Sequence, residues 1–365
     1  MKGGTPLLGR ESSVALGIAA LINDVQSYPQ LFKELGEMPL LYKINLEPDS
    51  QPYAVQFPRG VSVPLMPKVK RELDRLESLD LEVIKKITVP TDWCAPMVVV
   101  PKSNDQVKIC VDFTRLNQAV KRERHILPTV DHVLAQMSGA TIFSKLDVNS
   151  GFHQIKLTED SKPLTTFITL YGRFCYNRLP FGINSGPEHY QRQLHRVLEN
   201  QQGVVCLMDD IVVYGEDLKE HDERLNQVFR KLSKAKMTLN KEKCQFRKSE
   251  ISFLGQSVRK NGIKPEPAKV SAVVGIEAPQ NVGELRRFLG MVNQLGKFLP
   301  KLTTVTEPLC GLLSTEVAWH WEEPQNYAFG EIKKMLSCAP VLSLYDPNLN
   351  LKLPLIVLHM DLEQC

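Results

Sequence analysis

The chain has 365 residues and is 43% hydrophobic, which is enough for two or more hydrophobic cores and excludes a largely disordered protein. It carries 45 lysines and arginines against 41 aspartates and glutamates, and the net charge of +4 permits a polyanionic partner without requiring one. Its eight cysteines form no C-x-x-C pair or zinc spacing, which indicates reduced thiols in an intracellular, cytoplasmic protein. Because the sequence shows no signal-peptide pattern and no apolar run long enough to span a bilayer, no membrane partner is expected.

The N-terminal part of the chain is poorly patterned. Prolines interrupt it repeatedly, and residues 14–60 are expected to form a connector. In residues 66–87 the apolar side chains follow helical spacing and charges occupy the other positions, which predicts an amphipathic helix with a basic outer face. The residues that define this spacing are Val69, Leu73, Leu76 and Leu79.

Two β-rich runs follow, residues 95–102 and 107–113, separated by Ser-Asn-Asp-Gln. Apolar runs joined by such a short polar segment predict a hairpin. Its ends carry Lys102 and Lys108.

The remainder of the chain mixes the two kinds of element. Strands are predicted within residues 141–157 and 165–182 and on both sides of Asp209. Helices are predicted from about Pro187 to Leu198, from His221 to Lys236, and from Asn281, where Asn281 and Glu284 resemble a capping box. The expected fold class is α+β.

Asp209 and Asp210 lie at the centre of CLMDDIVVYG, residues 206–215, between strand-forming apolar residues. Adjacent carboxylates in an apolar stretch repel each other and lose hydration, so such a pair commonly binds cations. The alternative is an acidic turn in a solvent-facing hairpin, since Asp is a common turn residue. The pair alone fits both interpretations.

Asp147 is the candidate for a third carboxylate. It ends an apolar strand and is followed by the turn formers Asn149, Ser150 and Gly151. The intervening elements are sufficient to return the chain beside the Asp209 hairpin. Three acidic groups at one point suit two Mg²⁺ ions about 4 Å apart, which assist phosphoryl transfer.

Six segments in this order resemble the reverse transcriptase of gypsy-type LTR retrotransposons, a resemblance that covers roughly residues 60 to 353. They are KLDVNSGFHQI (145–155), NRLPFGINSGP (177–187), CLMDDIVVYG (206–215), LNKEKCQF (239–246), FLG (253–255) and ELRRFLGMVNQLGKFLP (284–300). The resemblance implies a right-hand polymerase with fingers, an antiparallel palm sheet and a thumb. The implied function is an RNA-directed DNA polymerase acting on an RNA or DNA template with primer and on deoxynucleoside triphosphates.

By the same resemblance, Asp147, Asp209 and Asp210 are the catalytic, metal-binding carboxylates of the palm, and the Val148 carbonyl is a further ligand. The implied cofactor is a pair of Mg²⁺ ions, with Mn²⁺ as a substitute. A lysine, Lys243, resembles the basic residue that protonates departing pyrophosphate; its alternative is an exposed basic turn.

The resemblance also implies a nucleotide pocket. Phe152 falls where an aromatic ring crowds the sugar 2′ position and selects deoxynucleotides; the alternative is a core phenylalanine. Lys102 and Lys108 resemble fingers residues that contact the triphosphate, although lysines on a hairpin are more often merely solvated. Phe181 and Gly182 belong to the turn that holds the template and nascent base pair.

Nucleic-acid contacts are implied at three places. Met208 would lie under the primer terminus, or else simply pack in its strand. Phe253, Leu254 and Gly255 resemble a hairpin that grips the primer end. A helix bearing Arg286 and Arg287 resembles the thumb and would follow the duplex backbone by charge. His153, His189 and His221 adjoin these motifs and are interpreted as structural.

The ends depart from the family pattern, so a truncated polyprotein fragment is expected, with neither protease nor RNase H activity. Its alternative function is an inactive relic that binds nucleic acid without polymerising. An unrelated phosphohydrolase would explain the three aspartates but not the other motifs. The expected division is a protease remnant (1–13), a connector (14–60), fingers and palm (61–260), thumb (261–318), a truncated approach to an RNase H-like domain (319–353) and a divergent tail (354–365). We expect the protein in the cytoplasm, including virus-like particles.

Overall fold

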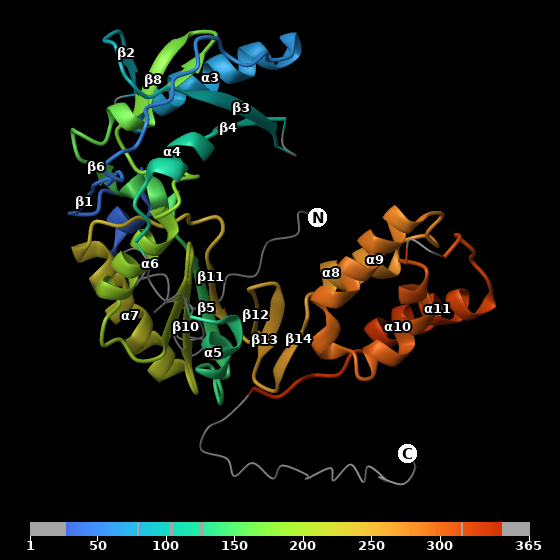
Figure 1. Ribbon diagram of the computed structural model, residues 1–365. Coiled ribbons are helices and arrows are strands. Elements are labelled where there is room, and N and C mark those ends of the chain that lie inside the picture. Colours follow the sequence, from blue (N-terminus) through green and yellow to red (C-terminus); the bar gives the residue numbers. More distant parts are fainter. Residues whose placement is uncertain (1–26, 79, 103–104, 124–127, 315–316, 345–365) are drawn as a thin grey trace, which may run out of the picture. The chain divides into compact units, whose positions relative to one another are not determined.

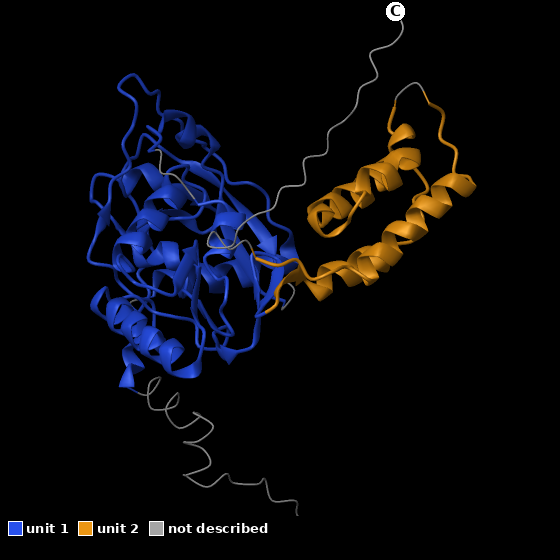
Figure 2. Cartoon of the chain, turned by 90° about the horizontal axis from the view of Figure 1, so that it is seen from below, with its two compact units in different colours: residues 1–260 blue, residues 261–365 orange. Residues whose placement is uncertain are grey.

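The computed structural model describes residues 27–78, 80–102, 105–123, 128–314 and 317–344. The chain forms two compact units, residues 1–260 and 261–365 (Figures 1 and 2). Within the described ranges, none of the helices combines the length and the apolar character needed to cross a membrane. The expected protease remnant (1–13) and the divergent tail (354–365) lie outside these ranges.

Unit 1 contains both helices and strands. Its α-helices are α3 (Met66–Glu77), α4 (Thr114–Ala119), α5 (Val130–Ala135), α6 (Gly186–Val197) and α7 (Leu218–Lys234), and its 3₁₀ turns are η1 (Pro29–Phe32), η2 (Val63–Leu65), η3 (Gly151–Gln154) and η4 (Pro163–Thr165). Its strands are β1 (Leu41–Tyr42), β2 (Ile84–Ile87), β3 (Ala95–Pro101), β4 (Val107–Val111), β5 (Ile142–Asp147), β6 (Lys156–Leu157), β7 (Phe167–Thr169), β8 (Gly172–Tyr176), β9 (Val204–Leu207), β10 (Asp210–Gly215), β11 (Gln245–Lys248), β12 (Glu250–Phe253) and β13 (Gln256–Arg259).

A four-stranded antiparallel sheet in the order β11-β5-β10-β9 lies at one end of unit 1 (Figure 1). Helices α6 and α7 pack against it, α7 on β5 and β10 and α6 on β9. The helix α7 begins where the Asp217 side chain accepts a hydrogen bond from the Glu220 N–H. Its apolar stripe, including Leu225, Phe229 and Leu232, is fully buried, as the helical spacing predicts.

A five-stranded sheet in the order β2-β8-β7-β3-β4 occupies the other end of unit 1 (Figure 1). The predicted hairpin is present as β3 and β4, which pair antiparallel, with Val100 opposite Lys108. The amphipathic helix predicted over residues 66–87 is present only in its first part, as α3, which packs against β2 and β4 and buries Val69, Leu73 and Leu76. The prediction was wrong for residues 84–87, which form strand β2 and pair with β8. Leu79, the last residue of the predicted stripe, lies outside the described residues.

The segment expected to be a connector contributes, from residue 27 on, to the core of unit 1. Leu31, Met38, Tyr42 and Ile44 are at most 3% exposed and belong to the same hydrophobic cluster as the two sheets. Strand β1 also pairs in parallel with β6. These apolar residues stand singly between prolines and polar residues and show neither helical nor strand periodicity, so their burial could not be predicted from the sequence pattern.

Unit 2 contains mainly helices. Its elements are β14 (Gly262–Pro265), α8 (Pro267–Val274), α9 (Val282–Gln294), η5 (Gly296–Phe298), α10 (Leu302–Gly311) and α11 (Glu323–Ser337). The predicted capping residue Asn281 caps α9 by accepting a hydrogen bond from the Glu284 N–H at 2.9 Å. Phe288 of α9 packs on Phe329 of α11, with ring centroids 4.7 Å apart.

Helix α11 belongs to the same core as α8, α9 and α10. The expected boundary between residues 318 and 319 therefore does not separate two hydrophobic cores within the described residues. That residues 319–353 lead toward an RNase H-like domain stays a prediction. The mixture of helices with largely antiparallel sheets confirms the α+β class.

Candidate active site

The paired carboxylates lie at a tight hairpin turn beside the end of β5. Strands β9 and β10 are joined by two residues, Met208 and Asp209, and Asp210 is the first residue of β10. In the register of β5 and β10, Asp210 lies directly opposite Asp147. The N–H of Val148 donates to the Asp209 carbonyl at 2.9 Å. The topology thus brings the three predicted carboxylates together at one end of β5 and β10, the central strands of the four-stranded sheet.

The hairpin turn holds Met208 in the left-handed region, with φ of 51°. Two-residue hairpins require positive φ in the turn, but a residue other than glycine adopts it at a cost of about 1–3 kcal/mol. Gln191, a fully buried residue of α6, holds this conformation. Its Oε1 accepts the Met208 N–H at 2.7 Å, and its Nε2 donates to the Cys206 carbonyl at 3.0 Å.

The sequence interpretation missed Gln191. The sequence feature that could have identified it is a polar residue that follows Tyr190 directly and lies on the buried face of α6. A buried amide must find partners, so a glutamine in that position indicates a specific hydrogen-bonding role.

The three carboxylates have unequal surroundings. Burial, reinforced by the charges of Asp147 and Asp210, raises the pKa of Asp209 to about 6. Burial also raises the pKa of Asp147, against the opposing effect of nearby Lys243. Asp210 forms an ion pair with Lys145, with Oδ2 and Nζ 2.9 Å apart, and Asp147 Oδ1 lies 3.5 Å from Lys243 Nζ.

The donor set suits a hard divalent cation, because carboxylate and carbonyl oxygens are the ligands that Mg²⁺ takes in proteins. Asp209 Oδ1 is buried and has no hydrogen-bond partner, so the protein alone does not satisfy this carboxylate. Among the described residues, no three His, Cys, Asp or Glu side chains stand close enough to enclose one ion.

A cavity of about 450 Å³ is lined by residues of both the four-stranded and the five-stranded sheet of unit 1 and contains most of the predicted nucleotide and catalytic residues. The predicted residues that line it are Lys102, Lys108, Asp147, Val148, Phe181, Gly182, Asp209 and Lys243. Residues from α3, including Arg75, complete the lining. Asp210, Phe152 and Met208 do not line this cavity.

One wall of the cavity is a layer of aromatic rings. Phe181 is 39% exposed, and the Nζ of Lys108 lies 4.7 Å above its ring. Behind it lies Phe152, only 7% exposed, with ring centroids 4.8 Å apart, and Phe152 in turn stacks on Tyr190. Gly182 has φ of 96°, a conformation that favours glycine, and its carbonyl accepts a hydrogen bond from the Asn117 side chain.

Two other predicted features can be located in unit 1. Lys243 follows the Asn240 turn, and its side chain is 66% exposed although its Nζ lies beside Asp147 Oδ1. In the FLG segment, Phe253 is fully buried, whereas Leu254 and Gly255 form a two-residue turn with φ of 51° and 75°. Positive φ at both positions is typical of a type I′ hairpin.

Arg286 and Arg287 lie in unit 2, on helix α9. Both are exposed, while their neighbours Leu285 and Phe288 are fully buried. The two guanidinium groups therefore occupy the solvent face of the helix, where a phosphate backbone could be contacted.

The three histidines that adjoin the motifs are held within the fold. Burial lowers the pKa of both His153 and His189 to about 4, which keeps these rings neutral. His221 Nε2 lies 2.9 Å from Ser144 Oγ, and its Nδ1 lies 3.0 Å from Asp222. His153 also lines the 450 Å³ cavity, and the structural role of the three histidines stays a prediction.

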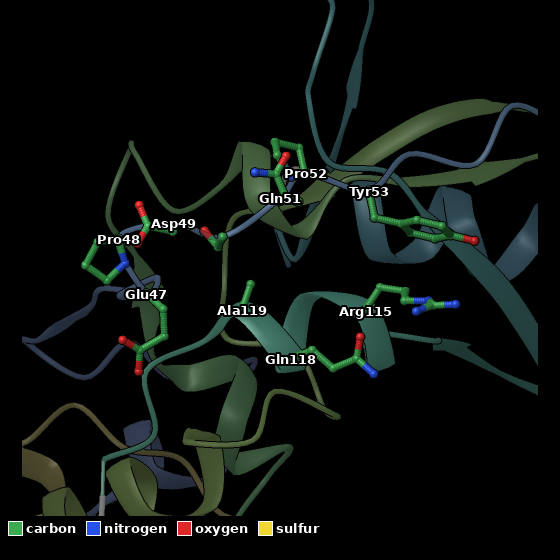
Figure 3. A pocket seen from close by; sticks show the side chains of 10 residues that line it. Glu47, Pro48, Asp49, Gln51, Pro52, Tyr53, Arg115, Gln118 and Ala119 are labelled. Carbon is green, nitrogen blue, oxygen red and sulfur yellow. The ribbon is translucent and has the colours of Figure 1, made fainter.

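A second cavity, of about 600 Å³, lies where residues 47–53 pass over helix α4 (Figure 3). Its lining includes the carboxylates of Glu47 and Asp49 and a single cation, Arg115, whose guanidinium lies 5.4 Å from the Tyr53 ring centroid. None of the predicted site residues lines it. With acidic groups in its wall, it lacks the charge that a triphosphate requires.

Comparison with known proteins agrees with the motifs. Residues 100–258 match the family model described as reverse transcriptase (RNA-dependent DNA polymerase). Over 253 residues, 69% of this chain, the sequence is 36% identical to the Transposon Tf2-3 polyprotein and 35% identical to the Transposon Tf2-7 polyprotein of Schizosaccharomyces pombe. The chain spans 19% of the length of these relatives.

Solved structures show the same fold. The foamy viral protease-reverse transcriptase in complex with dsDNA is similar with a TM-score of 0.84 and 23% identity, covering 93% of this chain and 71% of that one. The same enzyme in complex with an RNA/DNA hybrid gives a TM-score of 0.80, with 93% and 45% covered. The family model, the retrotransposon relatives and the polymerase fold agree, and the chain belongs to the reverse transcriptases of gypsy-type LTR retrotransposons.

Proposed function

We propose that this chain is an RNA-directed DNA polymerase, a nucleotidyltransferase that adds deoxynucleotides to a primer on an RNA or DNA template. The observation that carries the proposal is the cavity lined jointly by Asp147, Asp209, Lys102, Lys108 and Lys243. A deoxynucleoside triphosphate has a polyanionic end and a flat base. Cations, carboxylates and an aromatic wall in one cavity suit both parts of that molecule.

The reaction joins the primer 3′ oxygen to the α-phosphorus and breaks the bond between that phosphorus and the bridging oxygen of pyrophosphate. Lys102 and Lys108 neutralise the triphosphate, and Lys243 donates a proton to the departing pyrophosphate oxygen. Phe181 and Gly182 support the new base pair. Phe152 lies behind Phe181 and does not line the cavity, so it would favour deoxynucleotides over ribonucleotides by holding the Phe181 ring toward the sugar 2′ position.

Two Mg²⁺ ions, for which Mn²⁺ can substitute, would supply activation of the primer hydroxyl and neutralisation of the leaving group when bound. Asp147, Asp209, Asp210 and the Val148 carbonyl would hold them. Lys145 and Lys243 occupy the carboxylates of Asp210 and Asp147 in this structure and must release them.

The nucleic-acid partner is a primed template. The foamy viral relatives form complexes with dsDNA and with an RNA/DNA hybrid, which supports the same class of partner here. Met208 would contact the primer terminus, and residues 253–255 the primer end behind it. Arg286 and Arg287 would bind phosphates without reading bases, so affinity should fall steeply with salt. The seven cysteines of the described residues are free thiols, which favours an intracellular site of action.

The test is primer extension on an RNA template with Mg²⁺ and the four deoxynucleoside triphosphates. The matched control is the double variant Asp209→Asn/Asp210→Asn, which keeps the side-chain shapes and removes both charges. We expect incorporation by the wild type and none by the variant. Wild-type incorporation no greater than that of the variant would contradict the proposal, even if the protein binds an RNA/DNA hybrid in a salt-dependent manner.

A further inference from the structure

Tyr190 has a feature that packing does not explain. Its ring, on helix α6, is fully buried and stacks on Phe152, with centroids 5.1 Å apart and planes 18° from parallel. Its hydroxyl oxygen is buried without a hydrogen-bond partner. An unpartnered buried hydroxyl destabilises the fold, and phenylalanine would fill the same space without that penalty. The hydroxyl is therefore unfavourable for the fold as it stands.

A second unpartnered oxygen lies close by. Asp209 Oδ1, on the β9–β10 turn, is also buried without a hydrogen-bond partner. Burial, and next to it the nearby charge of Asp209, raises the pKa of Tyr190 well above its ordinary value, so the two groups lie within electrostatic reach of each other. One group is a donor without an acceptor, and the other is an acceptor without a donor.

Gly151 shows how near the two oxygens are. A Cβ atom placed on Gly151 would lie 2.6 Å from Asp209 Oδ1 and closer still to the Tyr190 hydroxyl. Both oxygens thus border the one small volume that the glycine leaves open. A side chain at residue 151 would fill it, so the glycine maintains the approach between the tyrosine and the carboxylate.

Resting on the proposed polymerase function, we propose that Tyr190 is a positioning residue for Asp209. Its hydroxyl donates a hydrogen bond to Oδ1, the inner oxygen, when Asp209 presents its outer oxygen to a divalent cation. The bond fixes the orientation of the carboxylate and compensates the inner oxygen for its lost hydration. Partners of this kind behind a metal ligand typically contribute 10–100-fold in metal affinity or activity.

The test compares Tyr190→Phe with the wild type, since this substitution removes only the hydroxyl. Binding of Mn²⁺ to the protein with a dideoxy-terminated primer, template and matching deoxynucleotide is measured by electron paramagnetic resonance. We expect about 10-fold weaker Mn²⁺ binding in Tyr190→Phe. Thermal stability and affinity for the primed template should be unchanged or slightly higher. The matched control is Tyr214→Phe, a half-buried tyrosine of β10 outside the cavity, which should bind Mn²⁺ as the wild type does.

Steady-state kinetics provide the second readout. At saturating nucleotide, the Mg²⁺ concentration for half-maximal rate should rise about 10-fold in Tyr190→Phe, while KM for the nucleotide stays unchanged at saturating Mg²⁺. If the wild type incorporates nucleotides and Tyr190→Phe binds Mn²⁺ as tightly as the wild type does, the role of Tyr190 is overturned but the polymerase function is not. A wild type that neither incorporates nucleotides nor binds Mn²⁺ would overturn the polymerase function and this inference together.

Discussion

Lys145 of β5 and Asp210 of the neighbouring strand β10 form an ion pair, with Nζ 2.9 Å from Oδ2. The same Nζ donates to the Ser252 carbonyl at 3.2 Å, immediately before the FLG turn. One lysine thus contacts both a predicted metal ligand and the backbone of the predicted primer-gripping hairpin. Both side chains are largely buried, 20% and 27% exposed, so the interaction is weakly screened by solvent.

We expect Lys145→Gln to destabilise the metal-free protein by about 1–2 kcal/mol, a loss that lies between those typical of breaking a surface ion pair and a buried one. Urea denaturation at pH 7.5 measures this change. Since the lysine stands where a cation would bind, added Mg²⁺ should reduce the difference in free energy of unfolding between the wild type and Lys145→Gln. The control is Lys43→Gln, which breaks the exposed pair with Asp160, 3.0 Å apart, and should cost less than about 0.5 kcal/mol. Equal losses in the two variants would contradict the prediction.

Asp209 should destabilise the metal-free fold at neutral pH. Its pKa is about 6 in the folded protein against 3.8 for an ordinary aspartate, so the folded state holds the proton more tightly than the unfolded chain. Its contribution to stability is therefore most favourable below pH 3.8 and is lost as the pH rises through 6. Allowing for its partial exposure, the loss is about 1–2 kcal/mol.

Asp209→Asn should therefore raise the free energy of unfolding at pH 8 without metal by about 1–2 kcal/mol, and this gain should vanish near pH 4. The same substitution should abolish incorporation. Chemical denaturation at a series of pH values is the measurement. Asp210→Asn, which weakens the ion pair with Lys145, serves as the control and should give no gain. A gain from Asp209→Asn that is independent of pH would show that the raised pKa is not its cause.

The sequence predicted the elements that have a strong period or a strong motif. Helices α6, α7 and α9 and the β3–β4 hairpin are present where the sequence pattern predicted them, whereas the helix predicted over residues 66–87 ends at Glu77 and gives way to strand β2. The approach of Asp147 to the aspartate pair was also predicted, because a returning strand is the simplest connection between the two motifs.

The contacts that the sequence did not predict connect residues far apart in the chain. Lys145 appeared only as a charge within a strand, yet it pairs with Asp210 on the neighbouring strand. Gln191 appeared as one polar residue of a helix, although it holds the Met208 turn. Side-chain partners of this kind depend on the relative placement of whole elements, which local periodicity does not encode.

The hydrogen bonds of Gln191 should support the geometry of the aspartate turn. In Gln191→Met, a side chain of similar volume, the Met208 N–H loses its acceptor, and we expect a loss of stability of about 1–3 kcal/mol. The rate constant kcat should fall about 10-fold or more, since the turn carries Asp209, while affinity for the primed template changes little. The control on the same helix is Gln193→Met, because Gln193 is also buried, at 3% exposure, but makes only long contacts, 3.4 Å to His189 and 3.5 Å to Arg196. Equal kinetic effects at the two positions would argue against a specific role for Gln191.

Lys108 should contribute chiefly to nucleotide binding. Its ammonium lies 4.7 Å above the Phe181 ring in the cavity, and loss of one charge-assisted contact of this kind is worth about 1.5–3 kcal/mol. We therefore expect Lys108→Ala to raise KM for the incoming deoxynucleotide by at least about 10-fold. Steady-state kinetics at saturating primed template provide the measurement. Lys86→Ala, on strand β2 outside this cavity, is the control and should leave KM unchanged. An effect on template affinity alone would refute the assignment of Lys108 to the triphosphate.

Gly151 and Tyr190 should be energetically coupled. In Gly151→Ala the new Cβ meets three atoms of two buried groups, with Tyr190 Cζ and Asp209 Oδ1 both 2.6 Å away, and overpacking of this kind costs about 1–3 kcal/mol. Tyr190→Phe removes the nearest of these atoms, so the double variant should recover about 0.5–1.5 kcal/mol of that loss. Denaturation of the four proteins in a double-mutant cycle measures the coupling. Gly290→Ala, where a Cβ meets nothing within 4 Å, is the control for glycine replacement and should be neutral or stabilising. Strict additivity of the two substitutions would place the Tyr190 hydroxyl away from the volume beside Gly151, and with it away from Asp209.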